Sequence, residues 1–144
     1  MKETYKQMKE RHQEEFNQFP MFAAFNKEQF ETGLKKLDLK TKEEAYHFAG
    51  GVFIRKSDVS KLRELFDKQL NEFYLAMETS DKFAINAFEY ELGNHEYVIT
   101  QDLTDTIHAL RYSTEHIESD KRLSKLLVKA INKYMKWQKE HGDW

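Results

Sequence analysis

Cysteine is absent from this chain of 144 residues, and proline and glycine are scarce. Without cysteine there can be no disulfide, no thiolate metal ligand and no cysteine nucleophile, so a bound metal would need nitrogen and oxygen ligands. This composition fits a reducing compartment. Proline occurs once, at Pro20, and glycine five times, which favours helices and leaves no flexible linker between domains. We therefore expect a single globular domain over residues 1–144.

Long apolar runs are also missing. No stretch approaches the roughly 18 consecutive apolar residues that cross a bilayer. The beginning of the chain, MKETYKQMKERHQEEF, is too polar for a secretory signal. We therefore expect a cytoplasmic protein without a membrane partner. Aromatic residues, in contrast, are plentiful, with eleven Phe and seven Tyr, so the chain has enough apolar surface to fold around a core.

Charge is unevenly distributed although the formal net charge is only −2. Residues 58–120 hold fourteen acidic and five basic side chains, whereas residues 121–139 hold seven basic side chains and no acidic one. Such segments are most often solvated helix faces. Residues 58–120 could also bind a basic protein surface, and residues 121–139 could bind nucleic acid.

Helical periodicity dominates the apolar pattern and predicts about six helices. Asn26 followed by Gln29, and Thr41 followed by Glu44, have the spacing of helix N-caps with reciprocal partners. The expected helices cover residues 2–18, a segment from Asn26, a short segment after Thr41, a long one from Ser57 to Met77, one from Asp102 or Thr104 to Leu110, and a last one striped from Leu123 to Met135. The segment that starts at Thr79–Asp81 and ends at Leu92 is either a helix, which we favour, or extended.

Two short segments are richer in β-branched and aromatic residues. Residues 51–55 (GVFIR) and 96–100 (EYVIT) are predicted to be strands. The fold class that follows is α+β: a mostly helical single domain with a small two- or three-stranded antiparallel sheet.

The segment ELGNHEYVITQD, residues 91–102, concentrates potential ligands and proton carriers. Glu91 lies four residues after Ala87 and three after Phe88, so a helix would place its carboxylate on the apolar face. A buried carboxylate without a partner is costly, and it must protonate, pair or bind a cation. His95 follows four residues later.

The sequence leaves open two ways in which the charge of the Glu91 carboxylate could be compensated. In the first, Glu91 accepts hydrogen bonds from His95 and from the turn, and Asn94 adopts the left-handed cap conformation. In the second, a divalent metal, zinc in preference, is bound by His95 together with two of the carboxylates of Glu91, Glu96 and Asp102. The segment lacks the second histidine of the HExxH motif, so the metal pattern is not specific. No nucleophile elbow or phosphate loop accompanies it, and we expect no catalytic residue.

Other polar residues have weaker signals. Arg55, with Lys56, could bind an anion after the first predicted strand, or it could pair with Glu91 or Asp58. His108 lies off the apolar stripe of its helix and is expected to face solvent. His12 falls on the apolar stripe of the first helix, where a hydrogen-bonded histidine at the core edge is usual. Three further histidines have no ligand-spaced partner: His47, His116 and His141.

The motifs AGGVFIRK and FEYELGNHEYVITQDLTDTIHAL resemble a family of small uncharacterised proteins from phages and mobile elements of Gram-positive bacteria. The resemblance extends over most of the chain. It implies a phage setting in a host bacterial cytoplasm, where inhibitors of host defence such as type II anti-CRISPR proteins are common. The residues that carry it include the candidate binding residues Arg55, Asn94, Tyr97 and Asp105.

Three hypotheses follow. The first is a non-enzymatic phage-type binding protein that inhibits a type II Cas nuclease and blocks its engagement of DNA. The second is a small metal-dependent enzyme acting on nucleotides or nucleic acid, with Glu91 and His95 as ligands and Glu96 as proton carrier. The third is a nucleic-acid-binding module. It would use the basic residues of the last helix: Lys121, Lys125, Lys129, Lys133 and Lys136.

Overall fold

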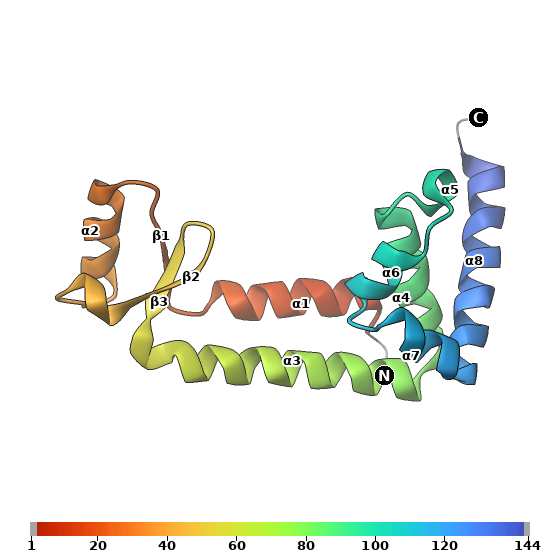
Figure 1. Cartoon of the computed structure of the whole chain (residues 1–144), viewed down its shortest axis with the longest axis horizontal. Helices are drawn as coiled ribbons and strands as arrows, with labels where there is room; N and C mark the ends of the chain where they lie inside the picture. Colours follow the sequence, from red (N-terminus) through yellow and green to blue (C-terminus); the bar gives the residue numbers. More distant parts are fainter. Residues whose placement is uncertain (1–2, 143–144) are drawn as a thin grey trace. The chain divides into compact units, whose positions relative to one another are not determined.

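The computed structural model describes residues 3–142 (Figure 1). The described chain forms eight α-helices, two 3-10 helices and three strands. In order these are α1 (Tyr5–Asn17), β1 (Phe22–Ala23), α2 (Lys27–Lys36), η1 (Lys42–Glu44), β2 (Ala45–Ala49), β3 (Val52–Arg55), η2 (Lys56–Asp58), α3 (Val59–Thr79), α4 (Asp81–Asn94), α5 (Tyr97–Thr100), α6 (Thr104–Ala109), α7 (Thr114–Ser119) and α8 (Lys121–His141).

The chain divides into two compact units. The sheet unit is His12–Asn71, and the helical unit combines Met1–Arg11 with Glu72–Trp144. Helices α1 and α3 each begin in one unit and end in the other. The fold class predicted from the sequence, mostly helical α+β with a small antiparallel sheet, is confirmed.

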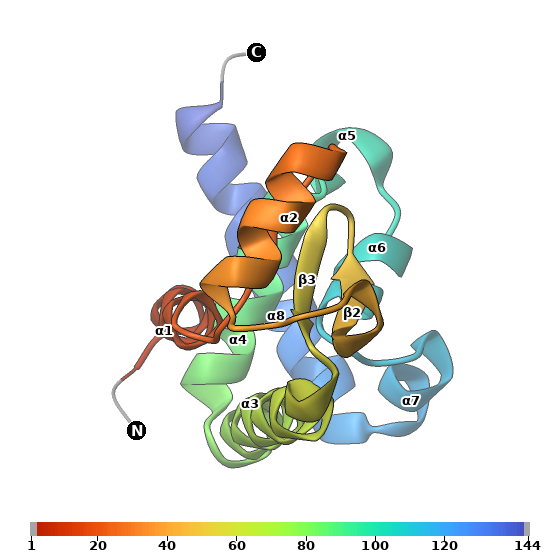
Figure 2. The same cartoon turned by 90° about the vertical axis from the view of Figure 1, so that its left-hand side faces the viewer.

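The sheet unit is built on three short antiparallel strands in the order β1-β3-β2. Figure 2 shows β2 and β3 joined by their turn. β3 is the central strand: Phe53 is opposite Phe22 of β1 and His47 of β2. A small apolar core of Phe22, Ala24 and Leu37 lies between the sheet and α2. The strand predicted at residues 51–55 is therefore confirmed as β3.

Helix α2 approaches β1 closely because one of its residues has no side chain. A Cβ on Gly33 would lie 2.0 Å from the ring of Phe22, so only glycine allows this contact. At the start of the helix the side chain of Asn26 accepts a hydrogen bond from the Gln29 N–H at 2.8 Å, which confirms the predicted N-cap. Gln29 in turn accepts from the N–H of Phe25 at 2.8 Å.

The helical unit is organised around α4, which packs against α8 and against α6 (Figure 1). Ser80 caps α4 by accepting from the Phe83 N–H, and Asp120 caps α8 by accepting from the Leu123 N–H. The largest fully buried side chain of the unit is Phe88 of α4. Around it lies the main core, with residues from α3, α4, α6, α7 and α8 and with Tyr5 and Met8 of α1.

One predicted strand is wrong: residues 96–100 form a turn and the short helix α5. The N–H groups of Ile99 and Thr100 bond to the carbonyl of Glu96, and left-handed residues, Glu96 and Gln101, bound the helix. β-branched residues favour strands only when a neighbouring strand pairs with them, and all three strands of the described chain come from residues 22–55.

Two strands were not predicted. β1 lies in the apolar connection after Pro20, and β2 follows the segment in which a short helix was expected. Thr41 does precede a turn of 3-10 helix, but its side chain makes no capping hydrogen bond. β1 has only two residues, too few for a repeated alternation, and the five residues of β2, AYHFA, do not alternate between apolar and polar, which explains why periodicity missed both strands.

None of the helices in residues 3–142 is both long enough and apolar enough to pass through a lipid bilayer.

Candidate functional site: the buried Glu91 cluster

Glu91 is buried in the helical unit, with 1% of its surface exposed. It lies on the inner face of α4 beside Ala87, Phe88 and Leu92, all of which are fully buried. The helical spacing of the sequence had placed it there. A carboxylate in this position requires compensation, because removing an ion from water costs several kcal/mol when it has no partner (about 3–5 kcal/mol for a broken buried pair).

Four side chains surround the carboxylate. The Tyr5 hydroxyl donates to Oε2 at 2.5 Å, and the Lys9 ammonium lies 3.4 Å from the same oxygen. The Asn94 amide donates to Oε1 at 3.2 Å. His95 Nε2 lies 3.4 Å from Oε1 without hydrogen-bond geometry, so it contributes through charge or dipole only. Each carboxylate oxygen therefore has a hydrogen-bond donor from the chain itself.

The donor from Tyr5 is held in its protonated form. Burial, followed by the hydrogen bond to Glu91, raises the pKa of the Tyr5 hydroxyl above its ordinary value. The Glu91–Tyr5 contact joins the first turn of α1 to α4 across a separation of 86 residues. The Asn86 side chain adds a second link by accepting from the Tyr5 N–H at 3.1 Å.

Lys9 reaches the cluster from solvent. Its side chain is 47% exposed, and its ammonium lies 5.4 Å from the centre of the Tyr5 ring and 5.3 Å from that of the Tyr90 ring. Aromatic rings attract a cation over their faces. The rings of Tyr5 and Tyr90 thus help to hold the ammonium group of Lys9 beside the carboxylate of Glu91.

The turn after α4 is stabilised differently from the prediction. Asn94 is the last residue of α4 and His95 its C-cap, and the left-handed residue is Glu96, with φ of 52°. Asn94 was expected in that conformation; instead its side chain turns inward to Glu91. Asx and glycine residues tolerate positive φ best, but a glutamate in this position is fixed by the Glu96 N–H bond to the carbonyl of Gly93 at 3.2 Å.

The cluster also positions the segment that follows. The hydroxyl of Thr106, fully buried in α6, donates to the main-chain carbonyl of Glu91 at 3.3 Å. The Val98 N–H donates to the Tyr134 hydroxyl of α8 at 3.4 Å. The segment is therefore attached to α8 through Val98 of α5 and to α4 through Thr106 of α6.

The predicted metal ligands are only partly brought together. Glu91 and His95 are neighbours, but Glu96 and Asp102 are exposed, and within residues 3–142 Glu91 belongs to no group of three potential ligands. Asp102 serves α6 by accepting from the Thr104 N–H at 2.9 Å, and this bond lowers the pKa of its carboxyl. The metal set remains a prediction.

The candidate binding residues are spread over both units. Arg55 lies in the sheet unit, where it pairs with Asp58 at 3.1 Å and donates to the carbonyl of Leu37 at 2.9 Å. The sequence predicted Glu91 or Asp58 as its partner, and the structure shows the ion pair with Asp58. Tyr97 is half-buried against Tyr134 in the helical unit, and Asp105 is exposed on α6.

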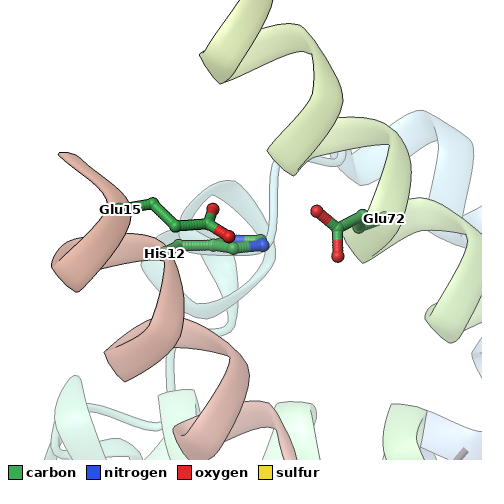
Figure 3. Close-up of side chains that lie close together, drawn as sticks. All are labelled: His12, Glu15 and Glu72. Atoms are coloured by element: carbon green, nitrogen blue, oxygen red, sulfur yellow. The ribbon is translucent and has the colours of Figure 1, made fainter. Parts of the chain in front are cut away.

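A histidine and two glutamates are drawn in Figure 3. His12 and Glu15 come from α1 and belong to the sheet unit, whereas Glu72 comes from α3 and belongs to the helical unit. Because these residues are divided between the two units, they form no site within either of them.

Tyr5 and Lys9 were not predicted from the sequence to be partners of Glu91. A weak signal existed: Tyr5 is on the apolar stripe of the first helix, and Lys9 follows one turn later. Periodicity shows which face of a helix is buried. It does not show which distant carboxylate that face will meet.

Exposed carboxylates are frequent in the segment that follows α4 and is hydrogen-bonded to Glu91 through Thr106. We call residues 96–118 the acidic segment; its exposed acids are Glu96, Asp102, Asp105, Glu115 and Glu118. None of the five forms an ion pair with another described residue. Ile99, on α5 within the same segment, is 73% exposed.

The outer face of α8 has the opposite charge. Its apolar face carries Leu123, Leu126 and Leu127 into the core, and the exposed lysines occupy the other side. Lys133 pairs with Glu89 at 3.3 Å. The lysines without a described ion pair are Lys121, Lys125, Lys129, Lys136 and Lys139. Trp137, 53% exposed, lies near the end of this row and stacks on His141; Trp144, also considered in the sequence, lies outside the described residues.

A family model matches residues 4–133 of the chain and describes a family of unknown function (DUF7659). The matched range includes every residue of the Glu91 cluster. No curated protein and no solved structure matches the chain.

Proposed function

We propose a function for this chain, which belongs to the DUF7659 family, from the surface that its Glu91 cluster supports. The protein is a non-enzymatic binding protein that presents the acidic segment, residues 96–118, to a basic surface of another protein. The observation that carries the proposal is the exposure of five acids without described ion-pair partners on a segment that also exposes an apolar side chain, Ile99. Protein interfaces commonly combine an apolar centre with a charged rim.

The buried cluster supports this role by fixing the segment before binding. Thr106 and Val98 are hydrogen-bonded to Glu91 and Tyr134, so the backbone on both sides of Ile99 is already ordered. An ordered surface loses less conformational entropy when a partner binds. In this proposal Glu91 is a structural residue and performs no chemistry.

The partner that we propose is a nuclease of host defence, and most concretely a type II Cas nuclease. Such nucleases hold their nucleic acid in a positively charged channel. An acidic, preformed protein surface can occupy a basic channel and exclude DNA from it. The motif resemblance to phage proteins and the charge of residues 58–120 support this choice.

The test is a DNA-cleavage assay with purified nuclease and chain, together with direct measurement of their binding. The native chain is expected to bind and to reduce cleavage. The triple variant Glu96→Gln, Asp102→Asn, Asp105→Asn removes three exposed charges and keeps an oxygen acceptor at residue 102 for Thr104. We expect it to bind at least about tenfold more weakly.

A matched control removes the same charge elsewhere. Glu10, Glu31 and Glu43 are exposed and lie outside the acidic segment. Their triple change to Gln should leave both binding and inhibition intact. Absence of binding by the native chain removes the nuclease as partner, and equal effects of the two triple variants remove the acidic segment as the contact.

A second candidate function is nucleic-acid binding, favoured by the row of exposed lysines on α8 that ends near Trp137. Lysines bind phosphates, and an exposed aromatic ring can stack on a base. This candidate predicts an affinity for single-stranded DNA that falls steeply with salt. Changing Lys125, Lys129 and Lys136 to Gln should flatten the salt dependence by about 2–3 in slope. Affinity that is absent or independent of salt excludes it.

A further inference from the structure

A groove of about 530 Å³ lies in the sheet unit and is lined by β1, α2 and the residues between them. Its lining includes Phe22, whose buried ring packs directly against the main chain of Gly33 because Gly33 has no side chain to separate them. Its walls include Phe25, Glu28, Thr32 and Lys36. The groove is remote in sequence from the acidic segment and plays no part in the function proposed above.

The strand on one side of the groove has an unused edge. β1 pairs with β3 on one side only, since the strand order is β1-β3-β2. The N–H of Ala24 donates to Gly51 at 2.8 Å, so residues 22 and 24 point their backbone groups at β3. Residues in an antiparallel ladder alternate, and the N–H and C=O of Ala23 therefore point away from β3. Ala23 is exposed and lines the groove.

Phe25 offers an apolar anchor at one end. Its side chain is 81% exposed although one side of the ring is covered. A Cβ on Gly51 would meet the ring at 2.4 Å, so the ring lies directly on the main chain of the β2–β3 turn. This support leaves the remaining surface of the ring free. Aromatic residues, including Phe, are enriched at the centres of protein interfaces.

The helix wall carries opposite charges at its two ends. Glu28 and Lys36 are both exposed, and neither forms an ion pair with a described residue. They lie eight residues apart with Thr32 midway, so all three share one face of α2, spanning about 12 Å. The chain turns at residues 24–26 and Gly33 contacts Phe22, so Lys36 lies towards the start of β1 and Glu28 towards its end.

From this geometry we propose that the groove binds an extended peptide segment of a partner protein, which adds to β1 as an antiparallel strand. An antiparallel segment would begin near Glu28 and end near Lys36. A basic residue near its beginning would then face Glu28, and an acidic residue near its end would face Lys36. The distance of about 12 Å corresponds to about four residues of strand, since each advances about 3.4 Å.

The proposal therefore specifies a sequence pattern. Residues two apart on a strand face the same side, so the pattern is basic, any, apolar, any, acidic, with the apolar residue beside Thr32, midway between the two charges. The backbone of the segment bonds to Ala23. Main-chain bonds then give affinity, and the two charges select the direction.

The test uses the full chain and a labelled, capped heptapeptide, Ser-Lys-Thr-Val-Thr-Glu-Ser, with fluorescence anisotropy as the measurement. The control peptide exchanges the two charged residues. The native chain should bind the first peptide about tenfold more tightly than the second. The double variant Glu28→Lys, Lys36→Glu should reverse this preference.

Two variants separate the groove from general effects. Glu31→Lys with Lys35→Glu makes the same exchange on exposed residues of α2 that do not line the groove, and it should keep the native preference. Ala23→Pro removes the N–H that points away from β3 and breaks no hydrogen bond to β3. Proline is tolerated at such a position on an edge strand. It should weaken binding of both peptides about tenfold with an unchanged circular dichroism spectrum.

Equal affinity of the native chain for the two peptides overturns the proposal, as does the absence of saturable binding of either. An unchanged preference in the Glu28→Lys, Lys36→Glu variant, once circular dichroism shows it folded, also overturns it. If the exchange unfolds the chain, the double variant Glu28→Gln, Lys36→Gln replaces it and should remove the preference. None of these results depends on nuclease inhibition.

Discussion

At the scale of single residues, the most demanding position is Glu91. Its carboxylate is buried, and its neighbours are an aromatic hydroxyl, an ammonium, an amide and an imidazole. The neutral donors Tyr5 and Asn94 fix the geometry of the carboxylate, whereas the ammonium of Lys9 balances its charge. Removing any one of them should therefore have its own measurable effect.

Tyr5→Phe should lower the free energy of unfolding by about 2 kcal/mol, because it deletes a hydrogen bond to a buried charged group. Tyr112→Phe is the matched control: Tyr112 is also buried, but its hydroxyl has no hydrogen-bond partner among the described residues. That change should cost little or nothing. Urea unfolding at pH 7 measures both values, and equal losses would contradict the assigned role of Tyr5.

Alkaline pH should destabilise the fold through the same hydroxyl. The folded pKa of Tyr5 is raised above its ordinary value of 10.0. Its contribution is therefore complete below about pH 10 and is lost as the pH rises further, because the unfolded chain releases this proton first. Tyr5→Phe should reduce the fall in unfolding free energy above pH 10 by about 1.4 kcal/mol per pH unit. Urea unfolding between pH 9 and 11 tests this, and identical slopes would refute it.

Two glycines should respond in opposite directions to alanine. At Gly33 the new Cβ would lie 2.0 Å from the Phe22 ring, and Gly33→Ala should destabilise the sheet unit by about 1–3 kcal/mol. At Gly93, in α4, the nearest atom is 3.7 Å away on Tyr134. Gly93→Ala should stabilise by about 0.5–1 kcal/mol. Thermal unfolding followed by circular dichroism distinguishes the two, and shifts of the same sign would contradict the close contact.

Part of the residue-level site was predictable. Helical spacing identified Glu91 as inward-facing and His95 as its neighbour, because both signals are local. Tyr5 and Lys9 were not identified as partners, since their contact with Glu91 spans more than eighty residues. The left-handed conformation at Glu96 instead of Asn94 was missed because the side chain of Asn94 is required elsewhere.

At the scale of elements, similar sequence signals had different outcomes. Asn26 and Thr41 both precede a glutamine or glutamate at capping distance. Asn26 accepts the expected bond from Gln29, but Thr41 makes no capping bond, and Glu44 instead accepts from the Lys40 N–H at 3.1 Å. The motif is more reliable before a full α-helix than before one 3-10 turn, where fewer free N–H groups are aligned.

Asn26→Ala should therefore cost about 1 kcal/mol of unfolding free energy, because α2 loses its N-cap. Thr41→Ala should change it by less than about 0.5 kcal/mol, since no hydrogen bond is lost. Chemical denaturation of the two variants under the same conditions gives the comparison. A larger loss at Thr41 than at Asn26 would show that the observed caps do not control stability here.

Strands were the least predictable elements. β3 was recognised because four consecutive β-branched, aromatic or long residues follow two glycines. The segment at 97–100 has a similar composition but forms α5, because its own residues Tyr97 and Val98 pack on the main core of helices. Composition states what a segment prefers, and the surrounding elements decide whether a pairing strand is present.

At the scale of the whole molecule, the charge pattern of the sequence corresponds to separate surfaces. The acids of residues 96–118 lie on α6, on α7 and in the connections before and after α5, and the lysines lie on α8, all within the helical unit. No ion pair among the described residues joins these acids to these lysines. α8 pairs instead with acids of α4, through Arg122 and Asp81 at 2.6 Å and through Lys133 and Glu89 at 3.3 Å. Such segregation is useful for choosing partners by charge and makes binding sensitive to salt.

Metal removal tests how the Glu91 charge is balanced. Because Lys9, Tyr5 and Asn94 already supply a cation and two donors, treatment with a chelator should leave Tm unchanged. Elemental analysis before and after treatment identifies any bound metal. A fall in Tm with loss of zinc, accompanied by a greater effect of His95→Ala than of His108→Ala, would instead support coordination at this site.

The position of Lys9 has a further consequence. Its ammonium neutralises a buried carboxylate, yet almost half of its side chain is in contact with water. Acetylation removes the positive charge of a lysine. A modifying enzyme that reaches this residue from outside would leave Glu91 without its counter-ion, and the attachment of α1 to α4 would weaken. Surface chemistry at one lysine would thus be transmitted directly to the interior of the helical unit.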